Sequence, residues 1–332
     1  MARRAFLLGG SGQTGRALIP RLLERGWDVV VGTRGERELP AGVEHVQVDR
    51  GDDAALRAAL GSGADVLVDF VAFEPKHAEQ LLALRDVLGS VVVISSAAVY
   101  FPEDEADFAK LPVPIPERHE TIAPGPAGYS SKKAAIEQVL LGQDALPVTL
   151  LRAGAIHGPW SSWAREWFFV KRALDGRRAI VLAHRGESRF HPISVHNLAE
   201  LLWLASERPG HRVLNAGDPT APTVLEISRA IASTLGHEWA EVLIDEPVDG
   251  VGDTVWSTRH PIVLDMTEAE FELGYRPVTT YERAVPETVR WLVEATKDRP
   301  WEELMPRAAE LMQGSFGYAA EDELVRGLLT TG

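Results

Sequence analysis

The chain contains no cysteine among its 332 residues. This absence excludes disulfides, thiolate catalysis and cysteine-ligated metal sites. No apolar run approaches the roughly 18 residues that a membrane-spanning helix needs. Arg3-Arg4 precedes only a strand-length apolar run without a small-residue cleavage site, so we expect no signal peptide.

Basic residues are also in deficit. Lysine and arginine number 34 against 48 aspartates and glutamates, which gives a formal net charge of -14. Because nucleic acids and acidic membranes attract positively charged proteins, we expect neither as a partner. The apolar content of 45% is ordinary for a globular protein. We expect a soluble, cytoplasmic protein with one large α/β domain or two lobes.

What the sequence does have is a cluster of glycines directly after a short apolar run. Residues 5–8 (AFLL) predict a buried strand, and apolar residues at helical spacing in 16–25 predict a helix. Between them lie Gly9, Gly12 and Gly15, with Gly10 offering a second, tighter spacing. Glycine tolerates φ > 0 and leaves backbone N–H groups open to a phosphate at the helix N-terminus. Although such a turn alone is often only a turn, its place between strand and helix predicts a pyrophosphate site.

Strand-like and helix-like segments alternate through the first half of the chain. The expected strands after the first are 28–32, 43–48, 65–71, 91–94 and 148–151, and the expected helices are 53–60, 76–88 and 128–142. This alternation implies right-handed crossovers and a parallel sheet covered on both faces. We therefore expect an α/β fold with a doubly wound, parallel Rossmann sheet that binds ligands at the carboxyl ends of its strands.

The pattern changes in the proline-rich stretch 101–127 and again near residue 154. A loop as long as 101–127 is usually functional or mobile. Beyond it, tryptophans cluster and the elements shorten, with strand-like pieces at 179–182 and 190–194 and helices near 195–206 and 222–235. We expect a Rossmann domain over 1–153, a smaller, discontinuous C-terminal substrate-binding lobe mainly over 154–297, and an extension of one or two acidic helices over 298–332.

Tyr129 and Lys133 stand four residues apart at the start of a predicted helix and so share one face. A nearby ammonium favours the phenolate, and such a tyrosine can exchange a proton with a carbonyl or carbinol during hydride transfer. Ser96 ends a predicted strand, where its hydroxyl can hydrogen-bond the reacting oxygen. Taken singly, the pair occurs by chance on many helices and the serine can be a turn or a cap.

Together these residues resemble the short-chain dehydrogenase/reductase superfamily, in its extended, NAD(P)-dependent epimerase/dehydratase-like branch. Further matches are the segments 151–152 (LR), 157–159 (HGP), 195–199 (VHNLA) and 273–277 (LGYRP). The resemblance implies that Ser96 polarises the substrate oxygen and that Tyr129 is the acid/base. It also implies that Lys133 holds the nicotinamide ribose and tunes Tyr129. The chain differs from the residues that are usual in this branch at Leu8, Gln13-Thr14, Ala153 and His157. These differences leave the substrate class open.

The predicted cofactor site begins with the glycine turn, whose lining residues are Gly9, Gly12, Gln13, Thr14 and Gly15. NAD sites usually end the second strand with an acid for the ribose 2′-hydroxyl. Here Arg34 follows that strand and suits a 2′-phosphate, so we expect NADP in preference to NAD, with Glu36 left open as a ribose acid. Asp49 resembles the family's adenine-contacting aspartate. Asp69 and Phe70 are expected to line the cofactor by position, unless Asp69 only closes its strand.

The substrate candidates are His157, Trp160, Trp163 and Arg189, which lie where extended members build their pocket. The alternatives are that the tryptophans belong to the core and that Arg189 is a solvated charge. The histidines follow no recognised metal spacing, so we expect no metal.

We expect an NADP(H)-dependent oxidoreductase that transfers a hydride at a carbonyl or hydroxyl carbon of a small molecule, and Arg34 favours a reductase. One alternative is a nucleotide-sugar epimerase or dehydratase with retained cofactor, in which Glu117 of the proline-rich stretch either takes part or is only a surface residue. The other is a non-catalytic dinucleotide sensor or RNA-associated protein. The resemblance also implies a homodimer, which in this family forms through the helices that correspond to residues near 76–88 and 128–142.

Overall fold

The computed structural model describes residues 2–331, which divide into two compact units. The first unit holds residues 2–156, Val195–Pro219 and Leu264–Val278, and the second holds His157–Ser194, Thr220–Val263 and residues 279–331. Met1 and Gly332, the outer ends of the predicted domain 1–153 and extension 298–332, lie outside the described residues. None of the helices formed by residues 2–331 has the length and apolarity needed to span a bilayer.

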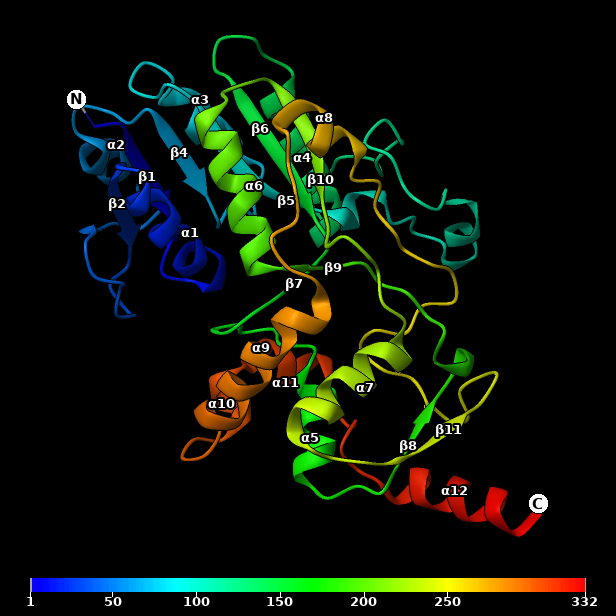
Figure 1. Cartoon of the computed structure of the whole chain (residues 1–332). Coiled ribbons are helices and arrows are strands. Elements are labelled where there is room, and N and C mark those ends of the chain that lie inside the picture. Colours follow the sequence, from blue (N-terminus) through cyan, green and yellow to red (C-terminus); the bar gives the residue numbers. More distant parts are fainter. Residues whose placement is uncertain (1, 332) are drawn as a thin grey trace. The chain divides into compact units, whose positions relative to one another are not determined.

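Strands and helices alternate along most of the first unit (Figure 1). Its elements are β1 (Arg4–Leu8), α1 (Gln13–Glu24), β2 (Asp28–Thr33), β3 (Glu44–Gln47), α2 (Asp53–Leu60), β4 (Val66–Asp69), α3 (Lys76–Ala83), β5 (Val91–Ser96), the 3₁₀ turns η1 (Ala97–Tyr100) and η2 (Glu105–Lys110), α4 (Tyr129–Leu141), β6 (Val148–Ala153), α6 (Val195–Glu207), β10 (Arg212–Ala216) and α8 (Thr267–Leu273). A further short strand, β7 (Ala155–His157), follows β6.

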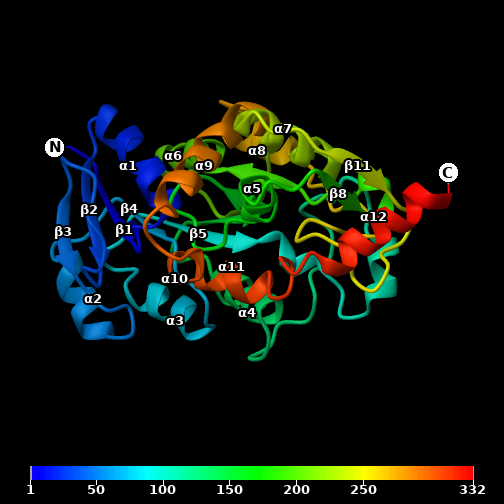
Figure 2. The same cartoon turned by 90° about the horizontal axis from the view of Figure 1, so that it is seen from below.

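Seven parallel strands form the sheet of this unit, in the order β10-β6-β5-β4-β1-β2-β3. Helices α1 and α6 lie on one face of it and α2, α3 and α4 on the other (Figure 2). The predicted doubly wound Rossmann sheet is confirmed. The strand order reverses between β1 and β4, and a ligand site is expected at the carboxyl ends of these two strands.

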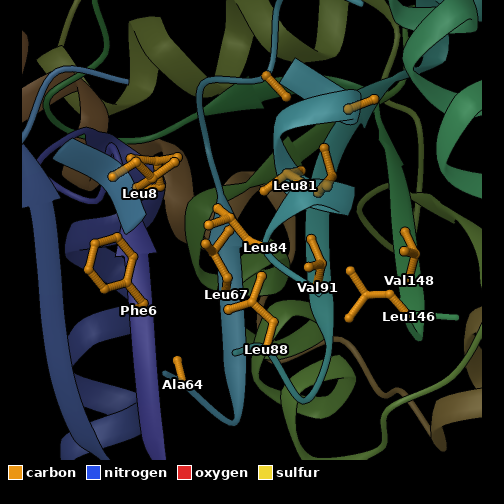
Figure 3. Packing of buried hydrophobic residues seen from close by; sticks show 14 of the residues in the cluster. Phe6, Leu8, Ala64, Leu67, Leu81, Leu84, Leu88, Val91, Leu146 and Val148 are labelled. Atoms are coloured by element: carbon orange, nitrogen blue, oxygen red, sulfur yellow. The ribbon is translucent and has the colours of Figure 1, made fainter. Parts of the chain in front are cut away.

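The core of this unit lies between the sheet and the helices of one face (Figure 3). Phe6 on β1, Leu67 on β4 and Val91 on β5 are at most 1% exposed. Leu81 of α3 and Leu88, which follows that helix, belong to the same cluster. The strands are apolar on both faces because both faces are covered, which is typical of a parallel sheet. This packed sheet is the rigid support for the loops at its edge.

The second unit is mostly helical. Its elements are α5 (Trp167–Leu174), β8 (Ala179–Leu182), the 3₁₀ turn η3 (His184–Gly186), β9 (Pro192–Ser194), α7 (Val224–Leu235), β11 (Ala240–Leu243), α9 (Tyr281–Ala295), α10 (Trp301–Leu304), α11 (Pro306–Leu311) and α12 (Ala319–Thr331). β8 and β11 pair in parallel, and α7 packs against both α5 and α9.

Two predicted helical segments differ from the structure. The helix expected over 76–88 ends at Ala83, because Leu84 to Leu88 turn back toward the sheet while their apolar side chains stay in the core and mimic a helical period. Residues 301–331 form three helices rather than one or two. Pro306 starts a new helix there, and Gly314, at a φ of +81°, lies between α11 and α12.

Candidate active site

The glycine-rich turn between β1 and α1 brings the chain into close contact with itself at two positions. Gly9 adopts a φ of +82°, and a Cβ there would lie 2.7 Å from a methyl carbon of Val71. A Cβ on Gly15 would lie 2.2 Å from the carbonyl oxygen of Gly10. The turn itself therefore requires glycine at these positions.

Gly12 is different, because nothing in the folded chain requires a glycine there. Its φ of -79° suits any residue, and the nearest described atom to an added Cβ is the Gly9 carbonyl oxygen, 3.9 Å away. Gly12 is the residue directly before α1, and among the described residues this helix has no side-chain cap and no acidic residue in its first turn. An uncapped helix N-terminus with an open approach suits a phosphate, so this cradle fits the pyrophosphate of a dinucleotide.

The next two predicted residues lie in the first turn of α1. Thr14 is buried, and the Oε1 atom of Gln13 is buried without a hydrogen-bond partner among the described residues. Buried acceptors are normally satisfied. Gln13 therefore offers an acceptor beside the cradle that a bound molecule can use.

The loop after β2 carries the predicted cofactor arginine. Arg34 and Glu36 are both well exposed, and the Arg34 guanidinium lies 3.1 Å from the Glu36 carboxylate. The two candidates for the adenosine ribose thus pair with each other. Asp49, after β3, is exposed, and its carboxylate accepts a hydrogen bond from the Gly51 N–H at 2.8 Å.

Asp69, at the end of β4, is fully buried, and its carboxylate has a strong partner. The Arg50 guanidinium donates to its oxygens at 2.6 and 2.7 Å, and the Val71 N–H donates at 2.8 Å. Gln80 accepts from the same guanidinium, which fixes its orientation. Phe70 follows, with its N–H bonded to the Leu8 carbonyl. The carboxylate of Asp69 therefore closes the strand end as part of a buried ion pair.

Lys133 is the most constrained of the predicted catalytic residues. Its side chain is buried on α4, and its ammonium donates to the carbonyls of Ala72 at 2.7 Å and Ile94 at 2.9 Å. The ammonium thereby ties α4 to the carboxyl ends of β4 and β5. Burial lowers its pKa to about 8, which the charges of Asp69 and Glu137 partly oppose.

Tyr129 and Ser96 lie at the same edge of the sheet. Tyr129 is the first residue of α4 and is 53% exposed, with its ring 5.8 Å from the Lys133 ammonium. Ser96 ends β5, two residues after the carbonyl that anchors Lys133, and its Oγ accepts a hydrogen bond from the Ala98 N–H at 3.2 Å. The structure thus places Ser96 at the carboxyl end of β5 and Tyr129 and Lys133 near the amino end of α4, at the same edge of the sheet.

A buried polar network joins α4 to β6 and η1. Arg152 on β6 donates to Glu137 of α4 and to the hydroxyl of Tyr100. Burial raises the pKa of Tyr100 to about 12, so its hydroxyl stays protonated and donates to Asn215 at 2.8 Å. Glu117 accepts from the backbone N–H of Asn215, and burial raises the pKa of its carboxyl.

The substrate candidates lie in the second unit. His157 is only 1% exposed, with its ring 4.7 Å from that of Tyr281. Its neighbour Glu166 is also buried, and burial raises the pKa of that carboxyl. Arg189 is half-buried and donates to the Ala221 carbonyl.

Two of these candidates are exposed tryptophans. Trp160 is 47% exposed, at a φ of +68°, and lies 5.9 Å from the ring of Trp291. Trp163 is 38% exposed and faces the Arg165 guanidinium. Across residues 2–331, no group of three or more His, Asp or Glu side chains is arranged to hold a metal ion.

Comparison with known proteins identifies the family. Residues 5–217 match the NAD dependent epimerase/dehydratase family. The chain belongs to this family. It is therefore an enzyme of the extended short-chain dehydrogenase/reductase superfamily, as predicted.

Individual proteins are similar to this chain in sequence or in fold. A dTDP-6-deoxy-L-talose 4-dehydrogenase (NAD(P)(+)) from Kitasatospora kifunensis is 27% identical over 318 residues, which is 88% of this chain and 96% of the relative. An epimerase structure from Methanothermobacter thermautotrophicus aligns with a TM-score of 0.71 at 18% identity and covers 91% of this chain and 94% of the other. The enzyme WbmG of Bordetella bronchiseptica, solved in complex with NAD, aligns with a TM-score of 0.69 at 19% identity over 89% and 95% of the two chains.

The structure also shows residues at this edge that the sequence did not single out. Arg50, in the loop after β3, binds Asp69 at the end of β4, although β3 and β4 are not neighbours in the sheet. His77 binds the backbone after β4. The sequence signal for His77 is a histidine in the first turn of a helix that follows a strand-to-helix loop. For Arg50 and Asp69, the sequence holds no spacing that predicts the pair.

Proposed function

We propose that this family member is an NADP(H)-dependent oxidoreductase that acts on a carbonyl or hydroxyl carbon through Ser96, Tyr129 and Lys133. The observation that carries the proposal is the buried Lys133 ammonium, held by two backbone carbonyls and facing the Tyr129 ring. A lysine is costly to bury, and it is buried here at the sheet edge where the family fold binds ligands.

A nicotinamide cofactor held at this sheet edge would supply or accept the hydride. The Tyr129 hydroxyl gives a proton to the substrate oxygen during reduction and takes it back during oxidation. The Ser96 hydroxyl donates a hydrogen bond to the same oxygen as negative charge develops on it. Ala72 and Ile94 take two of the three donors of the Lys133 ammonium, and we assign the third to a hydroxyl of the nicotinamide ribose.

The proposed cofactor contacts follow the sheet edge from the glycine turn outward. The cradle at Gly12 and the first turn of α1 hold the pyrophosphate. Arg34 turns from Glu36 to a 2′-phosphate, which offers it a more highly charged partner, and this favours NADP over NAD. The remaining assignments are that Asp49 contacts the adenine and that Phe70 lines the site.

On the substrate side, the exposed rings of Trp160 and Trp163 support a role in holding a small molecule. Contacts from His157 and Arg189 stay predictions, as do the division at 153 and 297, a homodimer and a cytoplasmic location. His157 can reach a substrate only if its buried surroundings open.

A second candidate is an epimerase or dehydratase that keeps its cofactor bound and returns the hydride to the same nucleotide sugar. The name of the family supports an epimerase or dehydratase, and the name of the Kitasatospora relative supports a nucleotide sugar as the substrate. In this candidate Tyr129 and Ser96 act on the sugar, and Lys133 again holds the nicotinamide ribose.

The test is calorimetric titration of the purified protein with NADPH, NADP⁺, NADH and NAD⁺, after mass spectrometry for cofactor retained through purification. Exchangeable binding that prefers NADPH supports the reductase and justifies a screen of carbonyl compounds. Tightly retained NAD⁺ supports the second candidate and a screen of nucleotide sugars. Binding of none of the four would overturn both.

A further inference from the structure

The segment between β4 and α3 is held by one histidine. Nδ1 of His77 accepts hydrogen bonds from the backbone N–H groups of Phe73 at 3.0 Å and Glu74 at 3.1 Å. The His77 side chain is 9% exposed and sits in the first turn of α3. Because Nδ1 accepts both bonds, the ring must be neutral with its proton on Nε2.

The residues held by His77 are those that contact the active-site helix. The carbonyl of Ala72 accepts from the Lys133 ammonium at 2.7 Å. The ring of Phe73 lies 4.9 Å from the same ammonium, within cation–π range. Glu74 forms an ion pair with Lys132 at 2.8 Å. Residues 72–74 therefore contact Lys132 and Lys133 of α4 in succession.

The other end of the same segment reaches the glycine turn. Val71 lies directly against Gly9, where an added Cβ would come within 2.7 Å of its methyl group. Residues 71–74 thus run from the proposed pyrophosphate cradle to the proposed ribose-binding lysine. A shift of this backbone by a fraction of an ångström would misplace the Ala72 carbonyl and with it the ammonium.

We propose that His77 is a positioning residue of the active site: its Nδ1 atom fixes residues 72–74 so that the Ala72 carbonyl holds the Lys133 ammonium toward the nicotinamide half of the cofactor. This inference rests on the proposed function, because it takes the lysine as the ribose ligand. It adds to that function a residue that touches neither cofactor nor substrate.

The surroundings of His77 keep it in the form that this role needs. Burial lowers its pKa to about 4, and the positive charges of Arg50 and Lys76 act in the same direction against Asp69 and Glu74. Near neutral pH the ring is therefore uncharged and accepts both N–H groups. Protonation of Nδ1 would turn the acceptor into a donor and release the segment.

The test compares two substitutions of similar size. His77→Asn places an oxygen near the position of Nδ1 and keeps an acceptor, whereas His77→Leu fills the space without one. Each variant and the wild type are titrated with NADPH and with 2′,5′-ADP, which shares the adenosine half of the cofactor but lacks the nicotinamide ribose. Lys133→Met serves as the reference for loss of the ribose contact, and circular dichroism checks that each variant is folded.

His77→Leu removes the two hydrogen bonds that fix the segment beside Lys133. We expect this variant to bind NADPH about five- to tenfold more weakly than the wild type. Binding of 2′,5′-ADP should change less than about twofold, and His77→Asn should restore most of the NADPH affinity. A merely structural defect would weaken both ligands together, and that result overturns the inference. The inference is also overturned if His77→Leu keeps the wild-type affinity for NADPH while Lys133→Met binds NADPH more weakly.

Failure of the proposed function gives a different pattern. If Lys133→Met binds NADPH as tightly as the wild type, the lysine is not the ribose ligand and the function proposal fails first. A second measurement covers the case in which His77→Leu does not fold. The ¹³C NMR titration of the Lys133 Cε in His77→Asn should keep the wild-type midpoint, because the Asn oxygen still fixes the Ala72 carbonyl. A midpoint lowered by more than about one pH unit would overturn the inference.

Discussion

Glu137 on α4 and Arg152 on β6 form a buried, two-point ion pair. The arginine Nη2 lies 2.7 Å from Oε2 of the carboxylate and Nε lies 3.2 Å from Oε1, with both side chains at most 6% exposed. Glu137 is four residues after Lys133 and eight after Tyr129, so all three lie on one face of the helix. The pair therefore fixes the rotation of the helix that carries the proposed catalytic residues.

Replacing one member of this pair should lower the stability of the folded protein. Arg152→Met leaves the Glu137 carboxylate buried without its main partner, and we expect a loss of about 3–5 kcal/mol in the free energy of unfolding. The double variant Glu137→Leu with Arg152→Met removes both charges and should recover part of that loss. Urea denaturation followed by circular dichroism measures both. A double variant no more stable than Arg152→Met would argue against this account.

Tyr129→Phe should remove the proton transfer while leaving the cofactor in place. We expect turnover to fall about 10²- to 10⁴-fold, since general acid–base catalysis contributes that much. The affinity for NADPH should change little, because the lysine anchors do not involve the lost hydroxyl. Steady-state kinetics on a substrate found by screening, with calorimetry as the control, makes the measurement. Full activity in this variant would show that the proposed site is wrong.

Arg34→Ala should affect the two cofactors unequally. A 2′-phosphate loses a charge-assisted contact in this variant, so NADPH affinity should fall about tenfold or more while NADH affinity stays nearly constant. Glu36→Gln is the matched control, because it breaks the Arg34–Glu36 pair yet leaves the arginine in place. It should leave NADPH affinity equal or higher. Equal losses for both cofactors in Arg34→Ala would remove the argument for a 2′-phosphate.

Local patterns predicted the fold well. Residues 53–60 and 179–182 form the helix and the strand that their apolar spacing indicates. The strand β10 was not predicted, because its alternation is interrupted by Arg212 and Asn215, whose side chains bind other parts of the first unit. Periodicity reports which side chains are buried, and it fails where a polar side chain is buried with a partner.

The candidate site was predictable only where chemistry follows a motif. The positions of Gly12, Tyr129 and Lys133 at one sheet edge follow from strand order and helical spacing. The carbonyl anchors of the lysine and the Arg50–Asp69 pair do not, since they join residues far apart in sequence by three-dimensional packing. Sequence spacing alone carries no information about such contacts.

The buried His77 should make stability depend on pH. Its folded pKa of about 4 lies below the ordinary value of 6.5, so the unfolded chain binds the extra proton between these values. The stability that neutral His77 contributes is present in full above pH 6.5 and is lost as the pH falls toward 4. His77→Asn should flatten this part of the profile of unfolding free energy against pH. An identical slope in wild type and variant between pH 4 and 6.5 would contradict the assignment.

Two glycines of the same turn should separate ligand binding from folding. Gly15→Ala forces a methyl to within 2.2 Å of the Gly10 carbonyl oxygen, and we expect it to destabilise the fold by about 1–3 kcal/mol or more. Gly12→Ala meets no described atom closer than 3.9 Å, so its free energy of unfolding should stay within about 0.5 kcal/mol of wild type. Its methyl occupies the open approach to the helix N-terminus, so dinucleotide affinity should fall at least about tenfold. Urea unfolding and calorimetry on the same two preparations decide the matter: a Gly12→Ala protein that is stable and still binds NADPH as the wild type does would mean that the cradle holds no pyrophosphate.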